Sequence, residues 1–160
     1  RAPVDTLPHM EDRALRPEFA PKPVYTLRVV LGPQDDAFTD NGIHTFLTET
    51  YTVTPEFDRM GCRLDGPVIS HKESGDIISD GIAFGAIQVP SAGTPIIMLG
   101  DRQTTGGYTK IATVITADFR TLAQLKAGDK ARFVQVPVEY AQGLLLSQRA
   151  ALKALSKINA

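Results

Sequence analysis

Short apolar runs separated by glycine and proline dominate the middle of this chain. Residues 83–89, 96–99 and 111–115 are rich in β-branched side chains and bounded by Gly or Pro. Runs of this length and composition are typical of buried or half-buried strands. Four more strands are predicted on the same grounds, at residues 25–31, 51–53, 59–64 and 130–136. Pro55 is expected to end the second of these, since proline cannot donate to a sheet ladder.

Helical periodicity is found at three places. Helices are predicted at residues 39–47, 120–125 and 137–158. Asp118 is a good N-cap for the second helix, and Gly128 suits the position after its end. Many short strands with few helices predict a mainly β fold, either a β-barrel or a sandwich, with two or three peripheral helices.

The first 24 residues differ in composition from the rest of the chain. They carry five prolines and few apolar anchors, which predicts an extended, Pro-rich arm or linker over residues 1–24. We expect one β-barrel domain at residues 25–136 and a C-terminal helix at 137–160. The chain begins with Arg1 rather than Met, so it is expected to be a piece of something longer.

Composition and charge exclude several classes of function. A length of 160 residues fits one domain, and a net charge of -1 gives no electrostatic case for nucleic acid or an anionic membrane. No apolar run is long enough to form a spanning helix. Cys62 is the single cysteine, so a reducing compartment, the cytoplasm, is expected, and Cys62 itself is interpreted as a small strand residue.

Familiar catalytic signatures are missing from the sequence. It contains no P-loop, no dinucleotide fingerprint, no HExxH and no G-x-S-x-G elbow. His71 has Glu73 and Asp76 near it, but one histidine with two flexible carboxylates does not make a metal ligand set. We therefore assign no metal-binding residue.

Two polar segments stand out between the predicted strands. Residues 70–81 are punctuated by glycine and predict a loop, with at most one short strand at 77–78. Residues 101–108 predict a second loop that combines an acid, a base, an amide, two adjacent threonines, a Gly-Gly pair and a phenol. A glycine pair lets a backbone approach a ligand or another strand closely. This second loop is a candidate site, although spacing alone does not specify its chemistry.

Four segments in a fixed order carry a resemblance to a known family. They are residues 59–67, 85–90, 101–108 and 112–118. This series closely resembles the allophanate hydrolase subunit 2 family, also called the biotin-dependent carboxyltransferase family, which includes the C subunit of the bacterial 5-oxoprolinase. The likeness covers about Leu27 to Val136. Nothing in residues 1–26 resembles the family's first block of strands, so the chain is expected to be the C-terminal half of such a protein.

The resemblance implies a cyclophilin-like β-barrel and a set of partners. These partners are a subunit 1 protein (the B subunit of the oxoprolinase), the missing N-terminal half and, in the oxoprolinase, a third subunit. The family's complex hydrolyses 5-oxoproline to glutamate at the expense of ATP, for which this chain has no signature of its own. Fused relatives form the carboxyltransferase part of urea carboxylase. No biotin-accepting lysine motif is present, so biotin would arrive on another domain.

The resemblance also gives candidate site residues at the ends of the matched segments. The catalytic candidates are Asp101 and Tyr108. The substrate-binding candidates are Arg59, Arg63, Gln88, Thr104, Thr105, Gly106, Gly107 and Lys110. The arginines suit a carboxylate, because the guanidinium fork binds it with two parallel hydrogen bonds.

Each candidate has a structural alternative. Arg63 is equally suited to an ion pair with Asp65 or Asp101, Gln88 to a bond with buried backbone, and the glycine pair to a tight turn.

The resemblance implies three functions to be weighed. The first is a subunit of an ATP-dependent hydrolase of small amides or lactams. The second is a non-catalytic module that completes or regulates a subunit-1-like partner, since a member of the family antagonises a sporulation-kinase inhibitor of that type. A prolyl isomerase ranks last, because it rests on the implied fold alone and fold does not fix function.

Overall fold

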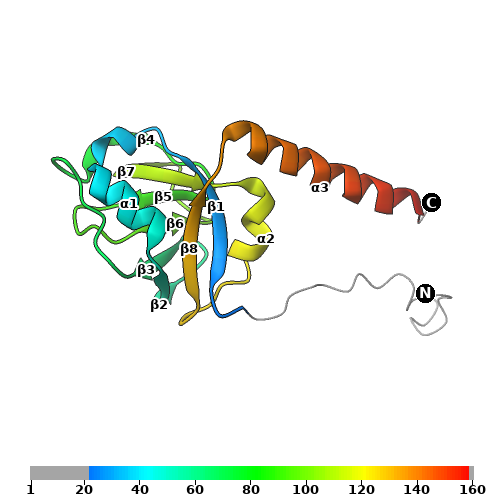
Figure 1. The fold of residues 1–160 in the computed structure, drawn as a ribbon, viewed down its shortest axis with the longest axis horizontal. Coiled ribbons are helices and arrows are strands. Elements are labelled where there is room, and N and C mark those ends of the chain that lie inside the picture. The colour runs from blue at the N-terminus through cyan, green and yellow to red at the C-terminus, as the bar shows by residue number, and fades with distance from the viewer. Residues whose placement is uncertain (1–21, 159–160) are drawn as a thin grey trace.

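A closed seven-stranded β-barrel with one additional strand forms the body of the protein (Figure 1). The structure is a computed structural model, and it describes residues 22–158. The strands are β1 (Tyr25–Leu31), β2 (Tyr51–Phe57), β3 (Gly61–Asp65), β4 (Asp76–Gly81), β5 (Ala86–Val89), β6 (Ile96–Met98), β7 (Thr105–Val114) and β8 (Lys130–Gln135). Their order is β1-β8-β2-β3-β6-β5-β7, and β7 closes the barrel on β1. The predicted β-barrel is therefore confirmed. The predicted arm at residues 1–24 lies almost wholly outside the described residues.

Long β7 belongs to the barrel at one end and leaves it at the other. Its C-terminal part pairs with β1 and β5, whereas residues near its start pair with β4. Strand β4 pairs with no other strand of the described chain. The protein thus carries a two-stranded extension where Thr105 to Tyr108 begins β7.

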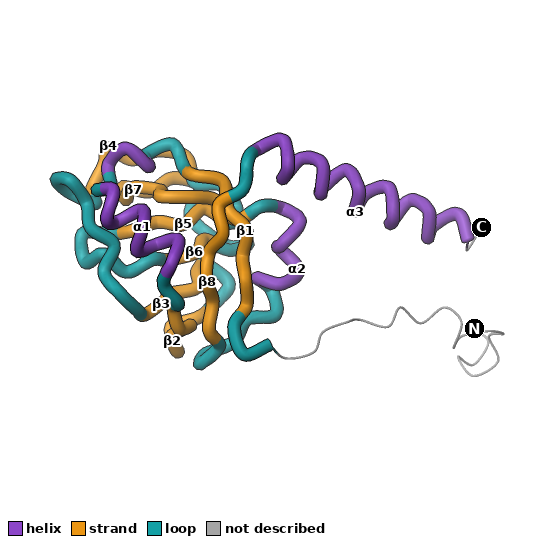
Figure 2. Tube along the Cα trace, in the orientation of Figure 1, coloured by secondary structure: helices purple, strands orange, loops and turns teal. Residues whose placement is uncertain are grey.

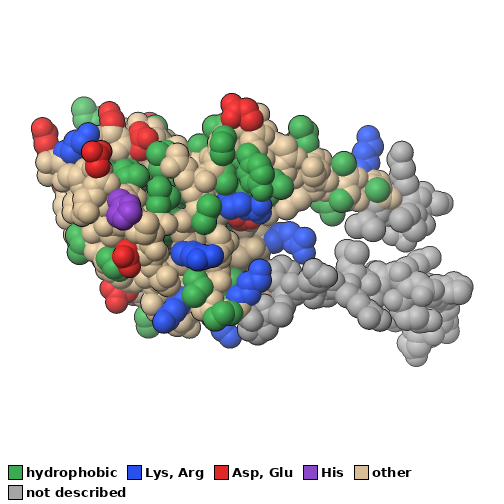
Figure 3. Space-filling view, viewed as in Figure 1, with side chains coloured by type: hydrophobic (Ala, Val, Ile, Leu, Met, Phe, Trp, Pro, Cys, Tyr) green, Lys and Arg blue, Asp and Glu red, His purple; other side chains and the backbone are tan. Residues whose placement is uncertain are grey.

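The described part of the chain has three α-helices, of which α1 and α2 lie beside the barrel (Figure 2). They are α1 (Asp40–Thr48), α2 (Phe119–Leu122) and α3 (Val138–Ile158), with short 3-10 segments η3 (Asp35–Ala37) and η4 (Thr116–Asp118). Thr39 accepts a hydrogen bond from Gly42 N at 2.9 Å, as its predicted capping role requires. Helix α3 projects away from the barrel, and Figure 3 shows hydrophobic side chains along it, among which Leu146 and Leu152 are exposed. None of the described helices is both long enough and apolar enough to span a membrane.

Alternation along the strands fills the barrel with apolar side chains. Cys62, Ile97, Ile87 and Ala112 are successive cross-strand partners on β3, β6, β5 and β7, and each is fully buried. Residues one position along point to the opposite face of the same strands. The barrel wall therefore has a packed inner side and an outer side available for a site.

Aromatic rings close the core beneath α1. Phe46 of that helix stacks on Phe133 of β8 at a centroid distance of 4.5 Å, and Tyr51 lies 5.9 Å from the same ring. Burial raises the pKa of Tyr51 to about 12, with a smaller contribution from the negative charge of Glu49. Because Phe46 and Tyr51 both pack on Phe133, which is distant in sequence, the rings fix α1 and β2 to β8.

Several predicted boundaries are wrong, for identifiable reasons. Strand β2 continues through Pro55 to Phe57, since the register shifts between Val53 and Phe57 and spares Pro55 from donating to the ladder. The predicted loop at residues 101–108 is half strand, because β7 starts at Thr105. Strand β4 is six residues long rather than two.

Asp118 does not cap a helix as predicted. Its side chain makes no cap hydrogen bond and instead accepts from Arg28 N at 2.7 Å and Arg28 Nε at 2.9 Å, and also pairs with Arg28 Nη2. Helix α2 is correspondingly short and ends at Leu122. Gly128 lies beyond its end, in the turn before β8, with a φ of +89°.

Candidate functional site

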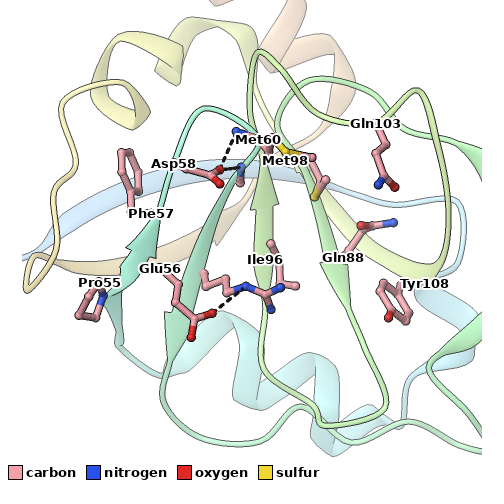
Figure 4. A pocket seen from close by; sticks show the side chains of 12 residues that line it. Pro55, Glu56, Phe57, Asp58, Met60, Gln88, Ile96, Met98, Gln103 and Tyr108 are labelled. Atoms are coloured by element: carbon pink, nitrogen blue, oxygen red, sulfur yellow. Dashed lines mark hydrogen bonds and ion pairs between the residues drawn. The ribbon is translucent and has the colours of Figure 1, made fainter.

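A cavity of about 680 Å³ lies against the outer side of the barrel wall (Figure 4). Strands β2, β3, β6, β5 and β7 all contribute to it. Its lining consists of Pro55, Glu56, Phe57, Asp58, Met60, Gly61, Arg63, Gln88, Ile96, Met98, Gln103 and Tyr108. The size is in the range of small-molecule sites, and the mixed apolar and polar lining is typical of them.

Cross-strand pairing builds the central row of this cavity. Arg63 of β3 is the partner of Ile96 on β6, and Ile96 is the partner of Gln88 on β5. Directly paired residues share one face of a sheet. Because the neighbouring row of Cys62, Ile97 and Ile87 fills the barrel, this row must face outward.

Charged groups are concentrated at the mouth of the cavity. Glu56 Oε2 lies 3.0 Å from Arg63 Nε, and both side chains are more than half exposed. A second hollow of about 380 Å³ adjoins the first across this pair and shares Pro55 and Ile96 with it. The Glu56–Arg63 pair therefore stands between two connected hollows.

Asp58 organises the turn between β2 and β3. Its Oδ1 accepts hydrogen bonds from Met60 N at 2.7 Å and Gly61 N at 2.9 Å. These backbone bonds, and then the nearby positive charges of Arg63 and Arg59, lower the pKa of the Asp58 carboxyl. The same turn places Met60, which is half exposed, on the rim of the cavity.

The deepest polar group is the Gln88 amide. Gln88 is 4% exposed, and its Nε2 has no hydrogen-bond partner among the described residues. A Cβ at Gly106 would lie 2.9 Å from this nitrogen, so β7 approaches the amide closely only because position 106 is glycine. In Figure 4 the amide points to the side of the cavity where Gln103 and Tyr108 lie.

The fold brings together three of the predicted site residues. Arg63, Gln88 and Tyr108 all line the cavity although they come from β3, β5 and β7. The alternative for Arg63 is wrong, because it pairs with Glu56 rather than Asp65 or Asp101. For Gln88, the amide nitrogen has no backbone partner among the described residues.

The other predicted residues lie outside the lining. Arg59 and Asp101 form an exposed ion pair at 3.1 Å, beside the rim residues Asp58 and Met60. Thr104 and Thr105 are exposed. Gly106 and Gly107 belong to β7 rather than to a tight turn, and Gly107 lies against the backbone of Ile77 on β4.

Lys110 is held behind the cavity rather than in it. The side chain is 3% exposed, and Nζ lies 3.3 Å from Asp80 Oδ2 without satisfactory hydrogen-bond geometry. Asp80 also accepts from Gln34 Nε2 at 3.3 Å, and Gln34 Oε1 accepts from Lys110 N at 3.2 Å. The Gly81 N–H, followed by Lys110, lowers the pKa of Asp80.

Sequence reasoning missed most of the apolar lining and several of its polar groups. The missed residues are Pro55, Glu56, Phe57, Asp58, Met60, Gly61, Ile96, Met98 and Gln103. Glu56 was detectable in principle, since a β2–β3 hairpin places it beside Arg63. Gln103 was detectable too, because it lies within the 101–108 segment already singled out.

The arrangement supports binding more clearly than nucleophilic attack. Cys62 faces the barrel interior, and burial raises the pKa of its thiol to about 12, so it is protonated at neutral pH. His71 is part-buried, with Nε2 at 3.1 Å from both Val89 O and Thr109 Oγ1. Within residues 22–158, no three His, Cys, Asp or Glu side chains gather as a metal site.

Comparisons with known proteins agree with this architecture. Residues 2–135 match the family described as "Carboxyltransferase domain, subdomain A and B". The chain is 37% identical over 143 residues to the 5-oxoprolinase C subunit of Haemophilus influenzae, covering 88% of this chain and 46% of that protein. It is 36% identical over 115 residues to the 5-oxoprolinase C subunit of Escherichia coli, covering 72% and 37%. The chain thus spans less than half the length of these relatives.

A solved structure shares the fold. The K. lactis urea amidolyase superposes with a TM-score of 0.81 at 25% identity, over 87% of this chain and 9% of that one. By sequence, the urea amidolyase of Saccharomyces cerevisiae is 28% identical over 163 residues, covering 95% of this chain and 9% of that protein. The same domain therefore occurs both in a separate subunit and within much longer enzymes.

Proposed function

Since this chain belongs to the family of carboxyltransferase domains with subdomains A and B, we propose that it forms part of the C subunit of a 5-oxoprolinase. The observation that carries the proposal is the identity of 36–37% to two proteins of that name. The subunit acts on a small amide or lactam in an ATP-dependent complex. The cavity on the outer face of the barrel is its binding site.

Three of the cavity residues have a proposed role in this reaction, supported by their positions in the lining. Arg63 retains the two Nη groups of its fork for a substrate carboxylate, because its Nε is engaged by Glu56. Gln88 donates to the amide, and Tyr108, which is partly exposed on the neighbouring strand β7, supplies a phenol near the reacting group. Asp101 and Arg59 form a pair beside the rim, outside the cavity lining. They act on the part of the substrate that lies at the rim.

Partners and cofactors come from other chains or segments. The proposed partners are a subunit 1 protein (the B subunit), the remaining half of the C subunit and a third oxoprolinase subunit. ATP is used by that complex at a site on another chain. The proposed compartment of the complex is the cytoplasm, a proposal supported by Cys62 being the single cysteine of this chain.

A second candidate is the carboxyltransferase part of a urea carboxylase-like system. It is favoured by the TM-score of 0.81 to the urea amidolyase structure. In that case biotin would be carried into the cavity by another domain. A regulatory module that binds a subunit-1-like partner without catalysis is the third possibility.

Rebuilding the complex tests the proposal. The chain is co-expressed with its cognate partner subunits and the remaining half of the C subunit, and glutamate release from 5-oxoproline with ATP is measured. Release that depends on this chain supports the oxoprolinase. An intact complex that releases no glutamate but carboxylates urea would favour the second candidate, and one with neither activity would favour regulation.

Two substitutions separate catalysis from assembly. Arg63→Ala and Asp101→Ala are expected to lower turnover while leaving co-purification of the complex intact, since both side chains are more than half exposed. Unchanged turnover in Asp101→Ala would remove Asp101 from the catalytic set without affecting the cavity.

A further inference from the structure

Gln88 carries a buried hydrogen-bond donor that the fold does not use. The side chain is 4% exposed, yet Nε2 meets no acceptor among the described residues. Burying an amide N–H without a partner is unfavourable, so native proteins rarely retain one for folding alone. One place where such a group is retained is a site at which a ligand supplies the missing acceptor.

Gln88 lines the cavity, so a ligand in the cavity is the candidate source of an acceptor for its amide nitrogen. Toward β7 it meets Gly106, and its cross-strand partner on that strand is the cationic Lys110. The Asp80 carboxylate on β4 is already engaged by Lys110, Gln34 and the adjacent Gly81 N. This end of the cavity therefore has more hydrogen-bond donors than free acceptors. A ligand oxygen that accepts hydrogen bonds is suited to it.

Arg63 and Gln88 face the cavity from either side of Ile96. They lie two strands apart, which corresponds to about 10 Å between their Cα atoms. Ile96, between them, offers an apolar surface that is only partly covered. A ligand that bridges the two polar groups needs an oxygen at each end and an apolar body between.

We propose that Gln88 Nε2 donates to the carbonyl oxygen of a small cyclic amide, whose ring lies on Ile96 and whose carboxylate binds Arg63. Gln88 is thereby the residue that favours a ligand with a carbonyl acceptor at this position over one that lacks it. The inference rests on the proposed function for its ligand class and adds the orientation of the ligand and the residue that selects it.

Thermal unfolding tests whether Gln88 is retained for binding rather than for folding. Gln88→Met keeps the length of the side chain and removes the unpaired donor, so the Tm of the whole chain should rise by about 2–4 °C. Gln124→Met, at an exposed glutamine away from the cavity, is the matched control and should leave the Tm unchanged. A lower Tm for Gln88→Met would overturn the inference, because it would mean that the amide stabilises the fold.

Titration calorimetry with three probes tests the orientation. The probes are 5-oxoproline, 2-pyrrolidinone, which lacks the carboxylate, and proline, which lacks the ring carbonyl. Gln88→Met should weaken binding of both carbonyl-bearing probes about tenfold and leave proline unaffected, as loss of one hydrogen bond predicts. Arg63→Met should weaken 5-oxoproline and proline but not 2-pyrrolidinone. Equal affinities in the wild type and Gln88→Met, or no probe bound by the wild type, would overturn the assignment.

The outcomes separate this inference from the proposed function. A rebuilt complex that releases no glutamate, while Gln88→Met still raises the Tm and weakens probe binding, would contradict the oxoprolinase and leave the amide site standing. Glutamate release that is unaffected by Gln88→Met would support the oxoprolinase and contradict the proposed role of Gln88.

Discussion

Asp118 shows how far a single residue can depart from its local sequence signal. It precedes a helix, as an N-cap should, but its carboxylate is 6% exposed and binds Arg28, 90 positions earlier. The hydrogen bonds to Asp118 raise the pKa of the Arg28 guanidinium. Sequence gives no sign of this pair, since its two members meet only when β1 is in place. Thr39, by contrast, caps the helix that follows it and was predicted from sequence.

Asp118→Asn should therefore destabilise the fold. Replacing the carboxylate leaves Arg28 with an incomplete partner in a part-buried site, for an expected loss of about 2–3 kcal/mol in the free energy of unfolding. Asp101→Asn is the matched control, because its pair with Arg59 is exposed and contributes roughly 0–1 kcal/mol. Urea unfolding monitored by circular dichroism measures both. Equal losses would show that burial of the Arg28–Asp118 pair has no consequence.

Cys62 provides a second test at this scale. Its thiol is buried in the barrel and protonated, so it should react with a thiol reagent far more slowly in the native chain than in urea. The measurement is the rate of reaction with 5,5′-dithiobis(2-nitrobenzoic acid) at pH 8. A rapid reaction of the native chain would show that Cys62 does not face the barrel interior. It would then contradict the assignment of the neighbouring row, with Arg63, to the outer face.

At the scale of elements, the boundaries of a strand or helix were predicted well where the pattern of its own residues indicates the element. Strand β1 and helix α1 were predicted closely from alternation, periodicity and the cap at Thr39. Strand β4 was predicted only at residues 77–78 and the start of β7 was missed, because both are polar and glycine-containing and pair with each other. Pairing partners distant in sequence override weak local preference.

Barrel closure between β1 and β7 depends on a glycine. A Cβ at Gly32 would lie 2.2 Å from Lys110 O, a backbone atom of β7 that cannot move aside. Gly32→Ala should cost more than about 2 kcal/mol of unfolding free energy, in the range of other overpacking substitutions. Gly81→Ala, where a Cβ meets nothing within 4 Å, should cost little. Similar midpoints in urea for both variants would contradict the close approach.

The Asp80 carboxylate, which accepts from Gly81 N and pairs with Lys110 of β7, should make stability depend on acid pH. The pKa of Asp80 is lowered in the native state, so its contribution is present above its ordinary value of 3.8 and is lost as pH falls below it. Asp80→Asn should therefore lower the Tm at pH 7, and the difference from wild type should vanish near pH ~2. A difference independent of pH would show that the charge of Asp80 is not involved.

At the scale of the whole molecule, the barrel class followed from the sequence but the site did not. Composition and strand count predict a β fold, whereas strand order decides which polar residues meet. Arg63, Gln88 and Tyr108 were named as separate candidates, and pairing of β3, β6 and β5 is what places the first two on one row. Lys110, equally polar in sequence, is drawn to Asp80 instead.

The central claim is that the outer face of the barrel, with Gln88 at its deepest point, binds the substrate of an oxoprolinase-type complex. The most direct test is ATP-dependent glutamate release from 5-oxoproline by the rebuilt complex, with this chain as wild type, Gln88→Met or Gln124→Met. We predict that kcat/KM falls at least about tenfold for Gln88→Met, consistent with the loss of one hydrogen bond to the substrate, and stays at the wild-type value for Gln124→Met. Wild-type kcat/KM in Gln88→Met, from a complex that assembles normally, would contradict the account.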